Sequence, residues 1–187
     1  MMLHLLLTTS FFALPITLFE QAGLAKSEHA MAYLPVLILA FIAMVPFIII
    51  AEKRRKMKPV FIGSVIVLGL VQLVWAFFAS SVTGILIGLW LFFTAFNILE
   101  ASLPSMMSKL SPLENKGTAL GIYSTAQFLG AFIGGATGGF LYGQFGVTGV
   151  FIAGAIITVV WLFFVFPMNQ PRHLSTKILE LPTLTEV

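Results

Sequence analysis

Long apolar stretches alternate with short polar segments along the whole chain. Residues 1–19, 30–51, 59–99 and 117–171 contain no Glu, Lys or Arg, and Asp is absent throughout. The two longest stretches are divided by small polar turns at residues 80–84 and 143–146. None alternates with the two-residue period of barrel strands, so the pattern predicts helices. We therefore predict six membrane-spanning helices, at residues 3–19, 31–51, 60–79, 85–107, 118–142 and 147–168.

Composition agrees with this class of protein. Of the 187 residues, 59% are hydrophobic and 9% are charged, whereas ordinary globular domains have about 25% charged residues. Neither a soluble domain nor a disordered chain fits this balance. We predict an all-α membrane protein, with a transmembrane domain at residues 1–168 and a short cytoplasmic tail at residues 169–187. The first stretch lacks a basic leading segment and a cleavage site, so we interpret it as a retained helix.

The distribution of basic residues predicts the orientation. Six crossings place both termini and two of the connections on one side, and nine of the ten basic residues belong to that side. They are Lys53, Arg54, Arg55, Lys56, Lys58, Lys109, Lys116, Arg172 and Lys177. Only Lys26 belongs to the other side, so the termini are predicted to be cytoplasmic. Membrane lipid rather than nucleic acid is therefore the expected partner of these charges.

The densest charge run, residues 52–58, has two interpretations. It begins with Glu52 and continues through the basic residues from Lys53 to Lys58. It can anchor the chain against anionic headgroups. It can also act as a conformational latch that bonds helix ends in one state of a transport cycle.

Glu100 is the candidate for chemistry because it lies inside a predicted span. A carboxyl group in the membrane costs about 2.5–3.5 kcal/mol on insertion scales, so it normally faces a cavity or a partner. A proton-coupling role and a structural role near the cytoplasmic end are both open. Asn97 lies one turn away and Thr94 lies two turns away, and both are candidate cavity residues.

Two other spans contribute candidates. In the first span, Thr8 and Phe11 follow a stripe that begins at His4, which is expected near the membrane surface. In the fifth span, Gln127 is a candidate cavity residue one turn after Tyr123. The same span is rich in small-xxx-small pairs, which allow close helix packing in lipid. The predicted packing residues are Gly130, Gly134, Gly135, Gly138 and Gly139.

Signatures of other function classes are missing from the sequence. It contains no GxSxG, HExxH or P-loop motif, and it has no Cys. We therefore predict a protein that is not an enzyme and that needs no cofactor and no metal.

The stretch from Asn97 to Gly146, NILEASLPSMMSKLSPLENKGTALGIYSTAQFLGAFIGGATGGFLYGQFG, resembles the carboxy-terminal half of a major facilitator superfamily transporter. It is most similar to the YajR-like proton-driven efflux transporters of the bacterial inner membrane. Residues 52–56 match the family's basic loop without its leading glycine. Residues 134–139 resemble its antiporter-type glycine motif, with Gly135 in place of the usual proline.

The resemblance implies half of a major facilitator fold, built as two inverted three-helix units. It implies that the first and fourth spans line a central cavity, and that the protein exports small, amphipathic organic molecules in exchange for protons. A second six-helix half is then needed, as a separate chain or as a missing amino-terminal portion. The alternative is a truncated or accessory six-span protein that transports nothing by itself.

Overall fold

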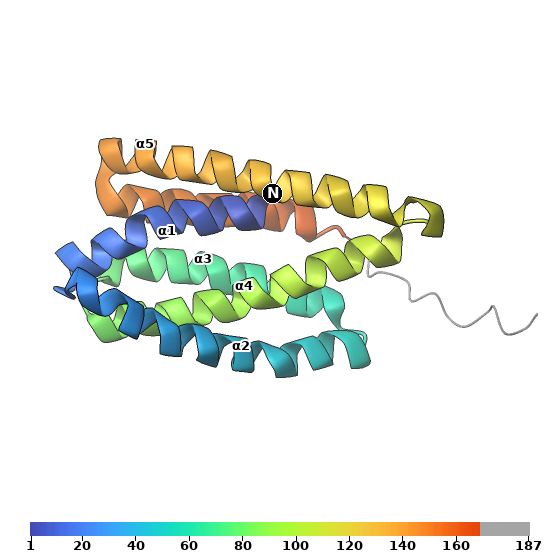
Figure 1. The fold of residues 1–187 in the computed structure, drawn as a ribbon, viewed down its shortest axis with the longest axis horizontal. Coiled ribbons are helices and arrows are strands. Elements are labelled where there is room, and N and C mark those ends of the chain that lie inside the picture. The colour runs from blue at the N-terminus through green and yellow to red at the C-terminus, as the bar shows by residue number, and fades with distance from the viewer. Residues whose placement is uncertain (169–187) are drawn as a thin grey trace, which may run out of the picture.

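A computed structural model describes residues 1–168, which form a bundle of long helices without any strand among them (Figure 1). The predicted tail, residues 169–187, lies outside the described residues. The long helices are α1 (Met2–Glu20), α2 (His29–Lys53), α3 (Met57–Phe78), α4 (Val82–Leu110) and α5 (Lys116–Val165). Two short 3-10 helices precede α2 and α5, namely η1 (Lys26–Glu28) and η2 (Leu113–Asn115).

Five of these helices are long and apolar enough to cross a membrane. The prediction of six differs because α5 contains two helices that meet at a kink at Gly146. Gly146 has φ +65° and ψ −168°, a left-handed φ that favours glycine. Figure 1 shows the two arms of α5, residues 116–145 and 147–165, running back along each other. The predicted turn at 143–146 is thus too long, since the helix continues to the residue before Gly146.

Several predicted helix ends also shift. Residues 82–84 belong to α4 rather than to a turn, and the amide of Ile85 donates to the carbonyl of Ser81 at 3.0 Å. At its other end α4 continues to Leu110, past Pro104 and past the predicted end at 107. Small and hydroxylated residues marked a turn in the sequence, but they are compatible with a helix when their backbone groups are bonded within it.

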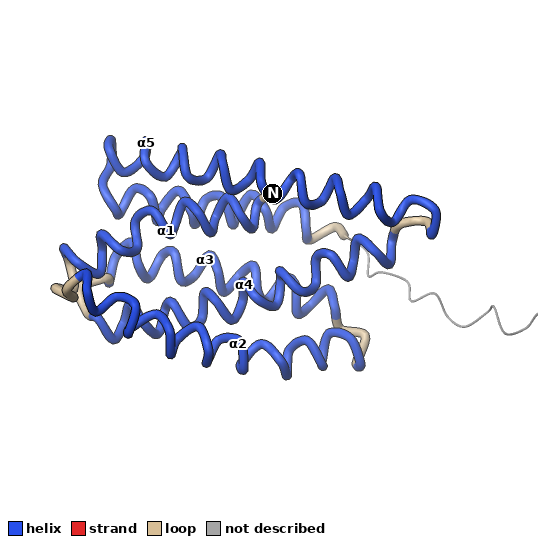
Figure 2. The backbone as a smooth tube through the Cα atoms, viewed as in Figure 1, coloured by secondary structure: helices blue, strands red, loops and turns tan. Residues whose placement is uncertain are grey.

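The connections gather at the two ends of the bundle (Figure 2). One end, which we call the basic end, carries the α2–α3 and α4–α5 connections, and the second arm of α5 finishes there. The opposite end carries the α1–α2 and α3–α4 connections and the point where α5 reverses. The basic residues at the basic end are Lys53, Arg54, Arg55, Lys56, Lys58, Lys109 and Lys116. Lys26 lies at the opposite end, so the segregation by charge that the sequence predicted is a feature of the fold.

The core forms between α1, α3, α4 and both arms of α5. Trp75 of α3 packs against Phe92 of α4 and Phe151 of α5, with ring centroids 5.5 and 5.4 Å apart. The buried amide of Gln72 donates a hydrogen bond to the hydroxyl of Ser10, which connects α3 with α1.

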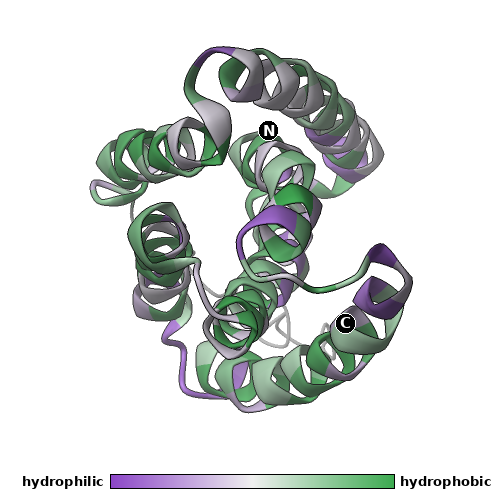
Figure 3. Cartoon of the chain, turned by 90° about the vertical axis from the view of Figure 1, so that its left-hand side faces the viewer, coloured by the Kyte–Doolittle hydropathy of each residue, from purple (hydrophilic) through white to green (hydrophobic). Residues whose placement is uncertain are grey.

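Many large hydrophobic residues are exposed on the outside of the bundle. Figure 3 shows that hydrophobic positions predominate along the helices. The helix α2 is the most exposed, and its side chains include Met31 at 80% exposure and Ile42 at 61%. A surface of this kind is stable in lipid or against another apolar partner.

Candidate functional site

A polar cluster surrounds Glu100 and joins α4 to α5. The amide nitrogen of Gln127 donates to Glu100 Oε1 at 2.8 Å. The same nitrogen donates to the hydroxyl of Tyr123, one turn earlier on α5, at 2.9 Å. The structure therefore brings together Glu100 and Gln127, which the sequence singled out separately, and it adds Tyr123 to them.

His4 of α1 completes this cluster. Its Nε2 lies 3.8 Å from Glu100 Oε2 and 3.5 Å from the amide nitrogen of Gln127. Its ring packs edge-on against Phe96 of α4 at 6.0 Å. Within residues 1–168, Glu100 Oε2 is a buried oxygen without a hydrogen-bond donor. A carboxyl group, an imidazole ring and one unfilled acceptor position therefore meet where α1, α4 and α5 converge.

His4 lies at the level of Glu100 in the bundle, and not at the membrane surface as its position in the sequence suggests. Glu100 precedes the end of α4 at Leu110 by about 15 Å of helix, and α1 begins at Met2, so its first turn reaches the level of Glu100. The early position of His4 in the chain suggested a place at the membrane surface, but α4 extends beyond the start of α1 toward the basic end (Figure 1). A histidine in an apolar span was the signal that could have found it.

Other predicted cavity residues lie elsewhere. Thr94 is buried, donates to the carbonyl of Trp90 at 2.7 Å, and lines a groove between α2, α3 and α4. Thr94 lies on another side of α4 from Glu100, since six residues along a helix turn it away, and its role as a cavity residue stays a prediction. Asn97 is half-buried one turn before Glu100.

The two candidates from the first span take part in helix packing. Thr8 donates to its own-helix carbonyl at His4, at 2.9 Å, and to the carbonyl of Ala131 of α5, at 3.0 Å. Phe11 is half-buried and packs on Phe93 of α4, with the ring centroids 5.4 Å apart. Both side chains connect α1 to its neighbours.

The glycines of α5 separate into two faces. A Cβ on Gly134 would overlap the carbonyl of Leu5 and the hydroxyl of Thr8, and a Cβ on Gly138 would meet the backbone of Thr9 at 3.2 Å. Gly130 likewise faces the backbone at the start of α1. We call Gly130, Gly134 and Gly138 the glycine seam. It holds α1 against α5, and the hydroxyl of Thr9 donates to the carbonyl of Gly134 at 3.0 Å.

The other two predicted packing glycines lie outside the seam. A Cβ on Gly135 would meet nothing within 4 Å, and one on Gly139 would touch only the ring of Phe12, at 3.6 Å. In residues 1–168 they make no close helix contact.

Glu52, at the end of α2, bonds to α4 at the basic end. Its carboxylate accepts from Lys109 Nζ at 2.6 and 2.8 Å and from the hydroxyl of Ser105 at 3.0 Å. The basic residues that follow it, Lys53, Arg54, Arg55 and Lys56, are exposed. The acidic and basic parts of this predicted loop therefore have different surroundings.

A charge swap tests the strength of the Glu52–Lys109 pair. Because both side chains are about one-third exposed, we expect a coupling of less than about 1 kcal/mol. Glu52→Lys and Lys109→Glu alone should each lower the melting temperature, and the double swap should recover part of the loss. Thermal unfolding in detergent measures this, and a double variant less stable than both single variants would contradict the pairing.

Residues 1–168 contain no group of three His or Glu side chains placed to hold a metal ion.

Comparisons with known proteins relate this chain to membrane transporters. A family model described as Major Facilitator Superfamily matches residues 1–183. The inner membrane transport protein YajR of Escherichia coli (strain K12) is 45% identical over 182 residues, which are 97% of this chain and 40% of that protein. An uncharacterized transporter of Buchnera aphidicola subsp. Schizaphis graminum is 31% identical over 166 residues, 88% of this chain and 42% of that protein. The chain thus spans about two-fifths of the length of these relatives.

Proposed function

Since this chain belongs to the major facilitator superfamily, we propose that it is the carboxy-terminal half of a proton-coupled exporter of small, amphipathic organic molecules. The observation that carries this proposal is the meeting of His4, Glu100 and Gln127 inside the bundle. A carboxyl group at this depth requires partners, and these partners respond to its charge.

In this proposal, protonation of Glu100 weakens the contact between α4 and the pair formed by α1 and α5. The glycine seam holds α1 and α5 together, whereas α4 has few contacts with either of them. Ionised Glu100 accepts from Gln127 and faces His4, which draws α4 toward α1 and α5. A proton on Glu100 removes its charge and weakens this link. Two protonation states therefore favour two arrangements of α4, and a difference of this kind is what moves a transporter between conformations.

Glu52 and Lys109 are proposed as a latch in the same cycle. Their ion pair connects α2 and α4 at the basic end in the conformation described here. Opening that end would separate the pair, so the latch favours the conformation in which it is closed. An exposed pair of this kind biases an equilibrium without blocking it.

The half is proposed to cross the membrane six times, as two inverted three-helix units. The kink at Gly146 supports two crossings for α5, and the sorting of basic residues between the ends supports a cytoplasmic basic end. The inner membrane is the proposed location, as for the relative YajR. On this proposal, one unit contains α1 to α3 and the other contains α4 and both arms of α5.

Cysteine labelling tests this topology, and the absence of natural Cys makes the chain suitable for it. We expect Lys26→Cys to react with a membrane-impermeant maleimide in intact cells, because Lys26 lies at the opposite end from the basic loop. Arg54→Cys should react only after the cells are permeabilised, with Glu114→Cys as a second reporter on the same side. Equal labelling of Lys26→Cys and Arg54→Cys in intact cells would contradict the proposed crossings.

The proposed partner is a second six-helix half, since the chain spans about two-fifths of its relatives. Proton flux in liposomes tests the transport proposal, with the chain alone and with the chain substituted for the matching segment of YajR. We expect substrate-dependent flux from the substituted protein. Its absence there would favour the alternative, a six-span protein without transport activity.

A further inference from the structure

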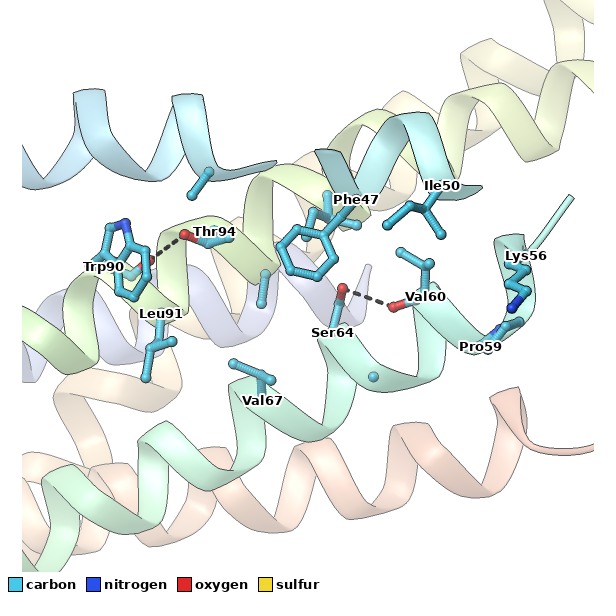
Figure 4. A pocket seen from close by; sticks show the side chains of 14 residues that line it. Phe47, Ile50, Lys56, Pro59, Val60, Ser64, Val67, Trp90, Leu91 and Thr94 are labelled. Carbon is cyan, nitrogen blue, oxygen red and sulfur yellow. Dashed lines mark hydrogen bonds between the residues drawn. The ribbon is translucent and has the colours of Figure 1, made fainter. Parts of the chain in front are cut away.

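An apolar groove runs between α2 and α3, with α4 as its floor (Figure 4). Its volume is about 480 Å³. The groove exists because α2 packs along α4 but makes few contacts with α3. Phe47 and Ile50 come from α2, Val60 and Val67 from α3, and Leu91 from α4. The Glu100 cluster does not line it.

The side chains that line the groove are mostly apolar. Two hydroxyl groups lie on it, and both are bonded within their own helices. Ser64 donates to the carbonyl of Val60 at 3.0 Å, and Thr94 donates to the carbonyl of Trp90 at 2.7 Å (Figure 4). The body of an occupant therefore gains most from being apolar.

The mouth of the groove is positively charged. Lys56 lines the groove at the basic end, and Lys53, Arg54, Arg55 and Lys58 belong to the same short segment. In the described part of the chain, the ion pairs are Glu52–Lys109 and His4–Glu100, and neither includes these five residues. The end of an occupant that lies here therefore gains most from being anionic.

The length of the groove matches one leaflet of a bilayer. From Lys56, directly before α3, to Val67 on α3, the lining residues cover about 16 Å along the helix direction. The hydrocarbon core of a bilayer is about 30 Å thick, so each leaflet contributes about 15 Å.

From these observations we infer that the groove binds an anionic glycerophospholipid. One acyl chain lies between α2 and α3, and the phosphate group is held by Lys56 with its basic neighbours. The lipid supports α2, which the protein itself holds mainly through α4. This inference depends on the chain lying in a membrane and not on the proposed proton coupling.

Quenching of tryptophan fluorescence by brominated lipid tests the inference. The chain has three Trp, of which Trp75 and Trp161 are buried while Trp90 lines the groove and is 37% exposed. The protein is placed in phosphatidylcholine bilayers that contain increasing fractions of brominated phosphatidylglycerol or brominated phosphatidylcholine with the same acyl chains. The Trp90→Phe variant supplies the background from the other two Trp. We expect brominated phosphatidylglycerol to reach half-maximal quenching at a lipid fraction at least about fivefold lower than brominated phosphatidylcholine does. The reason is that one contact between the anionic headgroup and a basic residue stabilises the bound lipid by this factor.

Two variants separate the groove from the mouth. A Cβ on Gly63, in the groove, meets nothing within 4 Å, so Gly63→Phe can fill the groove without moving the backbone. This variant should lose the preference for phosphatidylglycerol. Gly121→Phe is the matched control, because Gly121 is also open, lies about as far from the basic end and is not a groove residue. It should keep the preference.

The charge variant is Lys56→Gln, which should reduce the preference for phosphatidylglycerol over phosphatidylcholine about fivefold. Its control, Lys116→Gln, removes a basic residue at the same end but outside the groove and should leave the preference unchanged. Equal quenching by the two lipids would overturn the inference. So would an unchanged preference in Gly63→Phe, or an absence of Trp90 quenching by either lipid, which would mean that another helix fills the groove.

Discussion

Glu100→Gln is expected to abolish transport driven by a pH gradient. Glutamine keeps the shape of the side chain but cannot bind and release a proton. With one proton exchanged per substrate, a gradient of one pH unit sustains up to about tenfold accumulation, because each 1.4 kcal/mol corresponds to a factor of ten. The variant should give an accumulation ratio near one. It should still exchange substrate between equal concentrations, because its amide resembles the protonated carboxyl group.

The measurement uses the chain in place of the matching segment of YajR, in inside-out vesicles with a panel of fluorescent amphipathic compounds. Glu114→Gln is the matched control, since it removes a carboxylate from η2, outside the spans, and should accumulate substrate normally. His4→Ala should change the pH at which transport is half-maximal, because it removes the group that faces Glu100 at 3.8 Å. Gradient-driven accumulation that persists in Glu100→Gln would refute the coupling role.

Single methyl groups on the glycines of α5 are expected to have very different effects. Gly134→Ala places a Cβ on the carbonyl of Leu5, a backbone atom that cannot rotate away, so α1 must separate from α5. Overpacking of this kind costs about 1–3 kcal/mol. The hydrogen bonds that Thr8 and Thr9 donate to α5 would weaken as well, at about 0.6 kcal/mol for each bond between membrane helices.

Thermal unfolding of the chain in detergent should rank the variants by the space around each glycine. Gly134→Ala should be the least stable, and Gly138→Ala should be intermediate because its nearest atoms lie 3.2 Å away. Gly135→Ala is the control and should match or exceed the original stability, since its Cβ meets open space and alanine favours a helix. Equal stabilities for Gly134→Ala and Gly135→Ala would contradict the seam.

Most of the helical architecture could be predicted from the sequence. The spans follow from hydropathy, and the reversal in α5 was expected within three residues of Gly146, where the φ of +65° occurs. Helix ends were less accurate, because α4 continues through residues that are typical of turns. A polar residue marks a helix end only when its backbone bonds are lost, and this depends on the neighbouring chain.

The residues of the candidate site were harder to predict than the spans. Glu100 and Gln127 were identified as isolated polar groups in apolar helices, and the structure joins them by a hydrogen bond of 2.8 Å. Thr94, a candidate cavity residue on the same helix as Glu100, lines the groove between α2, α3 and α4 and does not join this cluster. The sequence predicts His4 near the membrane surface, whereas in the structure its Nε2 lies 3.8 Å from the unfilled oxygen of Glu100.

The sequence alone indicates a set of apolar helices with most of their positive charges at one end, and it places Glu100 within one of these helices. These properties depend on the free energy of transferring each residue from water into the membrane, which can be assessed without knowing its neighbours in the fold. Which helix faces meet is visible only in the folded chain, for example His4 against Glu100 and Gly134 rather than Gly135 against α1. The reason is that a helix apolar on all sides has no sequence period that marks its inner face, so packing geometry selects it.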